Sequence, residues 1–285
     1  MAEQRLDEQT GQTTTGHVYD GIEELNTPLP RWWLWTFYGT IVWGVVYTLL
    51  YPAWPLVTGA TAGLLGYSTR AEVAARIDEH AQRNAALVEA LVAADLASLS
   101  PQDDLHRYGT VRGEAVFRAH CSQCHGSGAA GAVGFPNLLD NDWLWGGTVD
   151  EIAHSIRHGI RNETDPDAHY SEMPAFGEML ERDEIELLVN YVAGLSSTDE
   201  VAEGLATELY RDNCASCHGD NAQGDRDLGA PNLADAIWLY GGDPDSLTET
   251  ITYARFGVMP AWGQRLSDAD VRAVALYVHS LGGGE

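Results

Sequence analysis

The chain has 285 residues, enough for two ordinary domains and additional sequence. Hydrophobic residues make up 45% and charged residues 20%, which excludes a disordered or collagen-like chain. Acidic residues outnumber basic ones by 42 to 16, every basic residue is an arginine, and the formal net charge is -26. A nucleic-acid-binding protein needs a basic face to meet phosphates, so we exclude nucleic acid as a partner. An acidic surface suits a basic protein partner, although it also serves solubility alone.

Residues 1–31 form a polar, acidic N-terminal segment, which we expect in the cytoplasm. From Trp32 to Thr69 the chain has no charged side chain, and residues 32–51 are the most apolar part. A helix of about 20 residues spans about 30 Å, the thickness of a bilayer core. Tryptophans and tyrosines cluster at both ends, as in an aromatic belt, and Pro52 ends the helix. We predict a single uncleaved membrane anchor over residues 32–56, because a signal peptide would begin with a short basic region.

Residues 57–102 connect this anchor to the rest of the chain. Within residues 71–99, apolar side chains recur at helical spacing, and arginines alternate with acidic residues. This pattern predicts an amphipathic helix that ends before Pro101. The helix either serves as a plain linker or packs on a partner subunit.

The remainder of the chain is an internal repeat. Cys-x-x-Cys-His-Gly begins at Cys121 and again at Cys214, and Pro-Asn-Leu, Trp-Leu-aromatic-Gly-Gly and Met-Pro-Ala-aromatic-Gly follow in both copies. We therefore predict two copies of one domain of about 90 residues after the N-terminal anchor. The predicted domains span residues 103–197 and 198–285, with the boundary inside residues 196–203. An extra loop around Arg161–Ser171 occurs only in the first copy.

Each copy is predicted to close with a helix, over residues 183–195 and 268–281. We expect each closing helix to pack on the first helix of its own copy. Tyr191 would then lie near Phe117, and Tyr277 near Tyr210, as ordinary core contacts.

All four cysteines lie in the two Cys-x-x-Cys-His motifs, the attachment pattern of c-type haem. Two thiols add to the haem vinyl groups, and the adjacent imidazole becomes the proximal iron ligand. A structural zinc site would need four soft ligands, and each motif supplies at most three. A redox Cys-x-x-Cys needs no following histidine, and a disulfide across two residues is strained. We predict two covalent haem c groups, with these attachment and axial residues: Cys121, Cys124, His125, Cys214, Cys217 and His218.

The sixth iron ligands are predicted by recurrence. Met173 and Met259 occupy the same place in the two copies, each before a proline, whereas Met179 has no counterpart and is expected to pack among apolar residues. Five histidines compete as ligands, but none of them recurs between the copies: His120, His154, His158, His169 and His279. Ligation by His and Met leaves no open position on the iron, which is typical of electron carriers.

The N-terminal region resembles one family more specifically. Residues 17–33 (HVYDGIEELNTPLPRWW), 51–55 (YPAWP) and 65–68 (LGYS) are similar to subunit III of cbb(3)-type cytochrome c oxidases, the CcoP/FixP family. The two repeats also resemble class I cytochrome c domains, which implies an all-α fold with one N-terminal transmembrane helix and two tandem class I cytochrome c domains. The family resemblance implies a dihaem electron-transfer subunit of a proton-pumping oxidase in the bacterial inner membrane, with its haem domains in the periplasm. Electrons would enter from a soluble or membrane cytochrome c and pass to a monohaem cytochrome c subunit, then to the catalytic haem b and copper subunit. It also implies that the two methionines are either used within their own domains or exchanged, which the sequence leaves open.

Two other functions compete with this one. The chain is alternatively a freestanding membrane-anchored dihaem cytochrome c that serves a periplasmic dehydrogenase or reductase. A haem-based sensor or catalyst with an open iron is the other, and the two Met-Pro motifs argue against it. No nucleophile elbow, phosphate loop or metalloprotease helix occurs in the sequence, so we assign no catalytic residue to this chain.

Overall fold

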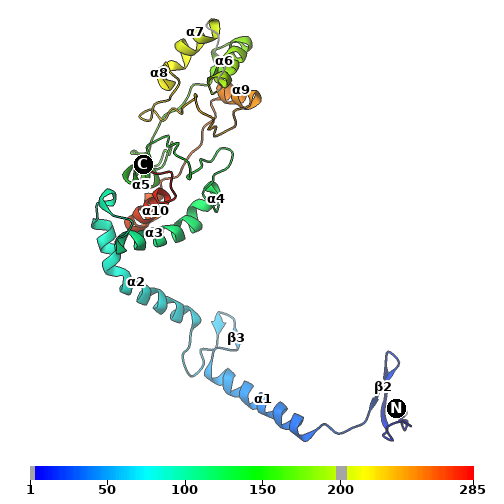
Figure 1. Ribbon diagram of the computed structural model, residues 1–285. Coiled ribbons are helices and arrows are strands. Elements are labelled where there is room, and N and C mark those ends of the chain that lie inside the picture. Colours follow the sequence, from blue (N-terminus) through cyan, green and yellow to red (C-terminus); the bar gives the residue numbers. More distant parts are fainter. Residues whose placement is uncertain (1–3, 197–203) are drawn as a thin grey trace. The chain divides into compact units, whose positions relative to one another are not determined.

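The computed structural model describes residues 4–196 and 204–285. The chain forms two compact units, one that ends at Gln82 and one from Arg83 to Glu285. Most described residues outside loops are helical, which confirms the predicted all-α class (Figure 1). Apart from Ser196, the predicted boundary over residues 196–203 lies outside the described residues.

The first unit begins with a β-hairpin that the sequence analysis missed. Strands β1 (Thr14–Tyr19) and β2 (Ile22–Leu25) pair antiparallel. The turn between them is Asp20-Gly21, and both residues have positive φ angles of 49° and 83°. Two such residues form the turn that matches the right-handed twist of a hairpin, and Asp-Gly is a preferred pair for it. This dipeptide was therefore the available signal in the sequence.

Helix α1 (Arg31–Leu50) is the predicted membrane anchor. It has 20 residues, none of them buried, and is long and apolar enough to cross a membrane. A small hairpin of β3 (Pro55–Leu56) and β4 (Gly59–Ala60) follows it. The backbone amides of Leu64 and Leu65 then donate to the carbonyls of Leu49 and Leu50. The returning loop thus satisfies carbonyls in the last turn of α1, which the helix itself leaves free.

Helix α2 (Thr69–Ala93) covers most of residues 71–99, where a helix was predicted, and it runs across the boundary between the two units. In the second unit, Leu91 is fully buried, and the short helix η1 (Leu96–Ser98) buries Leu96. Arg272 donates from Nε to the carbonyl of Leu91 at 2.8 Å. The end of the linker is therefore part of the core of the second unit.

The second unit consists of two lobes, named here by the motif that each contains (Figure 1). The first lobe contains Cys121, and its elements are α3 (Asp104–Val116), the π-helical turn η2 (Phe117–Cys121), α4 (Ser122–His125), α5 (Val149–His158), η4 (Trp262–Gln264) and α10 (Asp268–His279). The second lobe contains Cys214, and its elements are η3 (Phe176–Glu178), α6 (Arg182–Leu195), α7 (Leu205–Asn213), α8 (Ala215–His218) and α9 (Pro244–Tyr253).

The closing helices are exchanged between the two repeats. Helix α10, from the second repeat, packs on α3 and α5 of the first, whereas α6, from the first repeat, packs on α7 and α9. Phe117 accordingly contacts Tyr277, with ring centroids 5.4 Å apart, and Tyr191 contacts Tyr210 at 5.2 Å. The expectation that each closing helix covers its own repeat was wrong.

A close helix crossing holds the first lobe together. Gly113 on α3 faces α10, and a Cβ at this position would overlap the carbonyl of Ala273 and lie 2.8 Å from Cβ of Tyr277. The absent side chain lets the two backbones approach, and α10 buries Val271, Val274 and Leu276 in this interface. Each such side chain contributes about 1.5–3 kcal/mol when it is removed from water.

Two crossing segments, one through Ile160 and one through Met259, run between the lobes. They pair antiparallel, because Ile160 and Met259 exchange backbone hydrogen bonds of 3.0 Å.

Candidate functional site

The first Cys-x-x-Cys-His motif lies where α3 ends. The π-helical turn η2 delivers Cys121 to the core of the first lobe, and the single turn of α4 places Cys124 at the surface. Neither cysteine forms a disulfide. Burial, with a smaller effect of the neighbouring Cys124, raises the pKa of Cys121 to about 11. The Cys121 thiol is thus not activated as a thiolate for redox exchange.

The second motif repeats this arrangement in the second lobe. Cys214 is half-buried, Cys217 is exposed, and burial with a smaller effect of Cys217 raises the pKa of Cys214 to about 11. The motif again forms one helical turn, α8, after a longer helix. Both pairs therefore present two free thiols one turn apart, immediately before a histidine.

Each histidine is held through one ring nitrogen. Nδ1 of His125 lies 3.1 Å from the carbonyl of Pro136, and Nδ1 of His218 lies 2.9 Å from the carbonyl of Pro231. Because a carbonyl only accepts, Nδ1 carries the proton and Nε2 keeps its lone pair. Burial lowers the pKa of both histidines, against the smaller opposite effect of these hydrogen bonds. A neutral imidazole oriented by a backbone carbonyl is the usual arrangement of a metal-ligating histidine.

The loops after the two histidines begin with the same backbone hydrogen bond. The amide of Gly131 donates to the carbonyl of His125, and the amide of Gly224 donates to that of His218. Both glycines have positive φ angles, 68° and 77°. A Cβ at either position would overlap a backbone carbonyl. The recurring Pro-Asn-Leu segment therefore has a shared role: it carries the carbonyl that orients the histidine.

The Met-Pro segments are exchanged together with the closing helices. Met259 packs against the cluster that contains Phe117 and Cys121, and η4 packs on α5. The segment that follows Met173 packs on α9 through η3, with Gly177 against Thr252. The structure therefore brings Met259 into the lobe of His125, and the Met173 segment into the lobe of His218.

The competing residues have other partners. The ring of His120 contacts Trp262, and Nε2 of His279 lies 2.9 Å from the carbonyl of Glu285. His154, His158 and His169 lie together at the end of α5 and on the loop after it. Met179 is 58% exposed, so the expected apolar packing of this residue was wrong.

Sequence reasoning did not anticipate the carbonyls of Pro136 and Pro231 or the grouping of these three histidines. The carbonyls had a signal in the repeat, because Pro-Asn-Leu recurs after both motifs, 11 residues beyond His125 and 13 beyond His218. For the grouping of the histidines, the sequence showed only two histidines four residues apart in a helical pattern, next to a loop that the second repeat lacks.

Comparison with known protein families gives two matches. Residues 11–58 match the family described as the N-terminal domain of cytochrome oxidase-cbb3, FixP. Residues 110–192 and 203–278 match the family described as cytochrome C oxidase, cbb3-type, subunit III. The second match covers both repeats and confirms the predicted tandem cytochrome c domains.

Curated relatives resemble the chain over almost its whole length. The cbb3-type cytochrome c oxidase subunit CcoP of Cereibacter sphaeroides is 57% identical over 277 residues, which cover 95% of each chain. CcoP of Rhodobacter capsulatus is 53% identical over 285 residues, covering 95% of this chain and 96% of the relative. The subunit FixP of Sinorhizobium medicae is 47% identical over 284 residues, covering 98% of each.

Proposed function

The chain belongs to the CcoP/FixP family of cbb3-type cytochrome c oxidase subunits, and we propose that it is the dihaem subunit that passes electrons from a cytochrome c donor towards the catalytic subunit. Its cytochrome c domains imply haem c as cofactor. The observation that carries the proposal is the pair of motifs with free cysteines, each followed by a histidine whose Nδ1 is bound to a carbonyl. Its recurrence supports two haems, one in each lobe.

We propose the following residue roles. Cys121 and Cys124 attach the first haem and Cys214 and Cys217 the second, with these proximal ligands: His125 and His218. The donor set fits the cofactor, because both thiols of each pair are free and each imidazole keeps the lone pair of its Nε2. The carbonyls of Pro136 and Pro231 hold the rings in place and keep the proton on Nδ1.

We further propose that the distal methionines are exchanged between the repeats. Met259 would ligate the iron held by His125, and Met173 the iron held by His218. Two observations support this assignment: the backbone pairing of Met259 with Ile160 at the end of α5, and the packing of η3 on α9. When bound, haem c supplies one-electron redox chemistry, and His/Met ligation raises its potential and leaves no position for oxygen.

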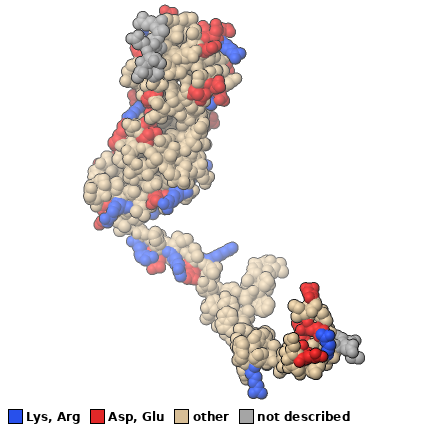
Figure 2. Space-filling view, turned by 45° about the vertical axis from the view of Figure 1, so that its right-hand side comes forward, with Lys and Arg blue, Asp and Glu red and all other residues tan. Residues whose placement is uncertain are grey.

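The acidic surface supports a basic electron donor. Residues 103–195 contain sixteen acidic residues against six arginines, and residues 199–285 contain fifteen against five. In the view of Figure 2, acidic side chains gather in several groups over the end of the second unit that holds α6 and α9. Complementary charge of this kind steers encounter and raises association rates.

The membrane arrangement follows from α1. This helix anchors the chain, and we propose that it spans the inner membrane once with both lobes in the periplasm, because haem c is attached outside the cytoplasmic membrane. The other oxidase subunits, including a monohaem cytochrome c subunit and the catalytic haem b and copper subunit, are the proposed partners. The match of residues 11–58 to the family's N-terminal domain supports this partnership over a freestanding carrier.

The test is to extract the native complex in mild detergent through a tag on this chain. We expect a reduced-minus-oxidised spectrum with b-type and c-type bands, together with oxygen consumption that depends on cytochrome c. A pure c-type spectrum without oxygen uptake, from an intact preparation, would instead favour the freestanding carrier. In the same preparation, Cys217→Ala should lower covalent haem by about one equivalent per chain, whereas an unchanged haem content would contradict the attachment assignment.

A further inference from the structure

The three grouped histidines lie beside two aspartates on the loop that only the first repeat has. His154 and His158 are four residues apart on α5 and therefore share one face of the helix. The following loop folds back over this face: the amide of His169 donates to the carbonyl of Gly159 at 3.2 Å, and the amide of Arg161 donates to that of His169 at 2.7 Å. This fold places Asp165 and Asp167 over the end of the helix.

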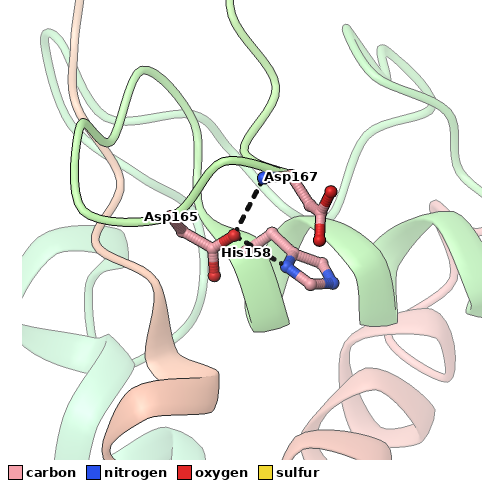
Figure 3. A group of neighbouring side chains, drawn as sticks. All are labelled: His158, Asp165 and Asp167. Carbon is pink, nitrogen blue, oxygen red and sulfur yellow. Dashed lines mark hydrogen bonds and ion pairs between the residues drawn. The ribbon is translucent and has the colours of Figure 1, made fainter.

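The side chains of His158, Asp165 and Asp167 converge on one point (Figure 3). One ligand atom from each lies within 4.8 Å of the other two. Nδ1 of His158 is 3.1 Å from Oδ1 of Asp165, which also accepts the amide of Asp167 at 3.0 Å. The side chains of His158 and Asp165 are only 20% and 14% exposed. Two of the three groups are thus ordered and largely shielded from water, while the Asp167 carboxylate is exposed and free to turn.

The cluster holds two carboxylates beside one imidazole, and the imidazole of His158 is paired with Asp165. Within the described residues, the Asp167 carboxylate has no ion pair, and the nearby Arg161 is engaged elsewhere, with its Nε on the carbonyl of Ser171 and its guanidinium over Phe256. Two carboxylates this close repel each other, and a cation between them would remove that repulsion.

His154 contacts both His158 and the backbone of the loop. Its ring lies 4.6 Å from that of His158, and its Nε2 is 3.1 Å from the carbonyl of Asp167. On its other side it contacts His169, which stacks on Trp145 with ring centroids 4.5 Å apart. The loop is therefore held in place by contacts that do not use the converging ligand atoms of Asp165 and Asp167.

We propose that His158, Asp165 and Asp167 bind a divalent transition-metal ion, with Zn²⁺ as the preferred ion and a water molecule as its fourth ligand. One imidazole nitrogen with two carboxylate oxygens suits Zn²⁺ better than Ca²⁺ or Mg²⁺, which prefer oxygen ligands alone. Ligand atoms around tetrahedral zinc lie about 3.3 Å apart, so a modest turn of Asp167 closes the site. The bound ion ties the extra loop to α5, next to the crossing segment that carries Met259.

The second repeat supplies an internal comparison. At the positions of α9 that correspond to His154 and His158, it has Glu249 and Tyr253, and it lacks the loop. It does contain another Asp-x-Asp turn, in which the amide of Asp227 donates to Oδ1 of Asp225 at 2.8 Å. This turn repeats the amide-to-carboxylate hydrogen bond of Asp165-x-Asp167, so it serves as a matched control.

The experiment measures zinc on the full-length, haem-loaded chain in detergent, purified with a tag free of histidine and stripped with a chelator. Equilibrium dialysis against Zn²⁺, with metal analysis by mass spectrometry, should give one saturable site that Asp167→Asn and His158→Gln each weaken at least tenfold. Asp227→Asn should bind zinc as the wild type does. Excess Mg²⁺ should not displace the ion.

Two further readouts separate metal loss from misfolding. Haem content and the reduced spectrum should be the same in all variants, because none of these residues lies in a Cys-x-x-Cys-His motif. Zinc should raise the unfolding temperature of the wild type but not of Asp167→Asn, since a ligand stabilises only the protein that binds it. Equal zinc affinity in wild type and Asp167→Asn, or no saturable site below about 1 mM, would overturn the proposal.

Discussion

Substituting Gly113 by alanine tests the exchange of closing helices most directly. Gly113 belongs to the first repeat, and the backbone that its added methyl group would meet, at Ala273, belongs to the second. The obstacle is a backbone carbonyl and the Cβ of Tyr277, so no flexible side chain can yield. Helices α3 and α10 must separate, and their shared apolar interface must open.

The expected magnitude follows from two opposing effects. Overpacking a core costs about 1–3 kcal/mol, and a collision with backbone belongs at the upper end of that range. Alanine gains about 1 kcal/mol over glycine as a helix former. The net loss in the free energy of unfolding is therefore about 2 kcal/mol, which lowers the unfolding temperature by about 4–8 °C for a unit of this size.

Hydrogen exchange measured by mass spectrometry shows which helices lose stability. In Gly113→Ala, amides of α3 and α10 should exchange faster, while those of α6 and α7 stay as protected as in the wild type. Gly128→Ala is the control, because a Cβ there would meet nothing within 4 Å. Gly109→Ala should be milder, since its Cβ would meet the movable Cδ1 of Leu276 at 2.6 Å. Faster exchange in α6 with α10 unchanged would refute the exchanged arrangement.

Three further predictions concern the redox sites and their surroundings. Met259→His should lower the midpoint potential of one haem and leave the other nearly unchanged in a redox titration, because a second imidazole replaces the thioether; equal shifts in both haems would contradict the ligand assignment. Burial, with Asp235 and Asp140, raises the pKa of Asp142, so its contribution to stability is full below the unfolded pKa of about 3.9 and is lost as pH rises through the folded pKa. Asp142→Asn should therefore raise the unfolding temperature at pH 7 but not near pH 3, and an equal gain at both values would argue against the raised pKa of this half-buried carboxylate. Turnover of the oxidase with a basic cytochrome c should fall steeply between low and high salt, since screening weakens attraction to the acidic lobes, and a flat response would rule out electrostatic docking.

Local patterns in the sequence determined the elements and the chemistry. A run without charged residues predicts α1, and apolar periodicity predicts α2, α6 and α10, because these signals depend only on which side chains lie near one another along the chain. The attachment cysteines and proximal histidines follow from the spacing of Cys-x-x-Cys-His, which one helical turn sets. The turn at Asp20-Gly21 was within reach of the same reasoning.

Only the tertiary structure decided which repeat closes which lobe. Phe117 and Tyr210 are equivalent, as are Tyr191 and Tyr277, so each closing helix offers nearly the same apolar face to either first helix. Periodicity contains no information that separates the two pairings. The choice depends on where the crossing segments run, and on the close approach that Gly113 permits to Ala273. For the same reason, the convergence of His158 with Asp165 and Asp167 arises only when the extra loop folds back on α5, because contacts across a loop are set by its path and not by residue spacing.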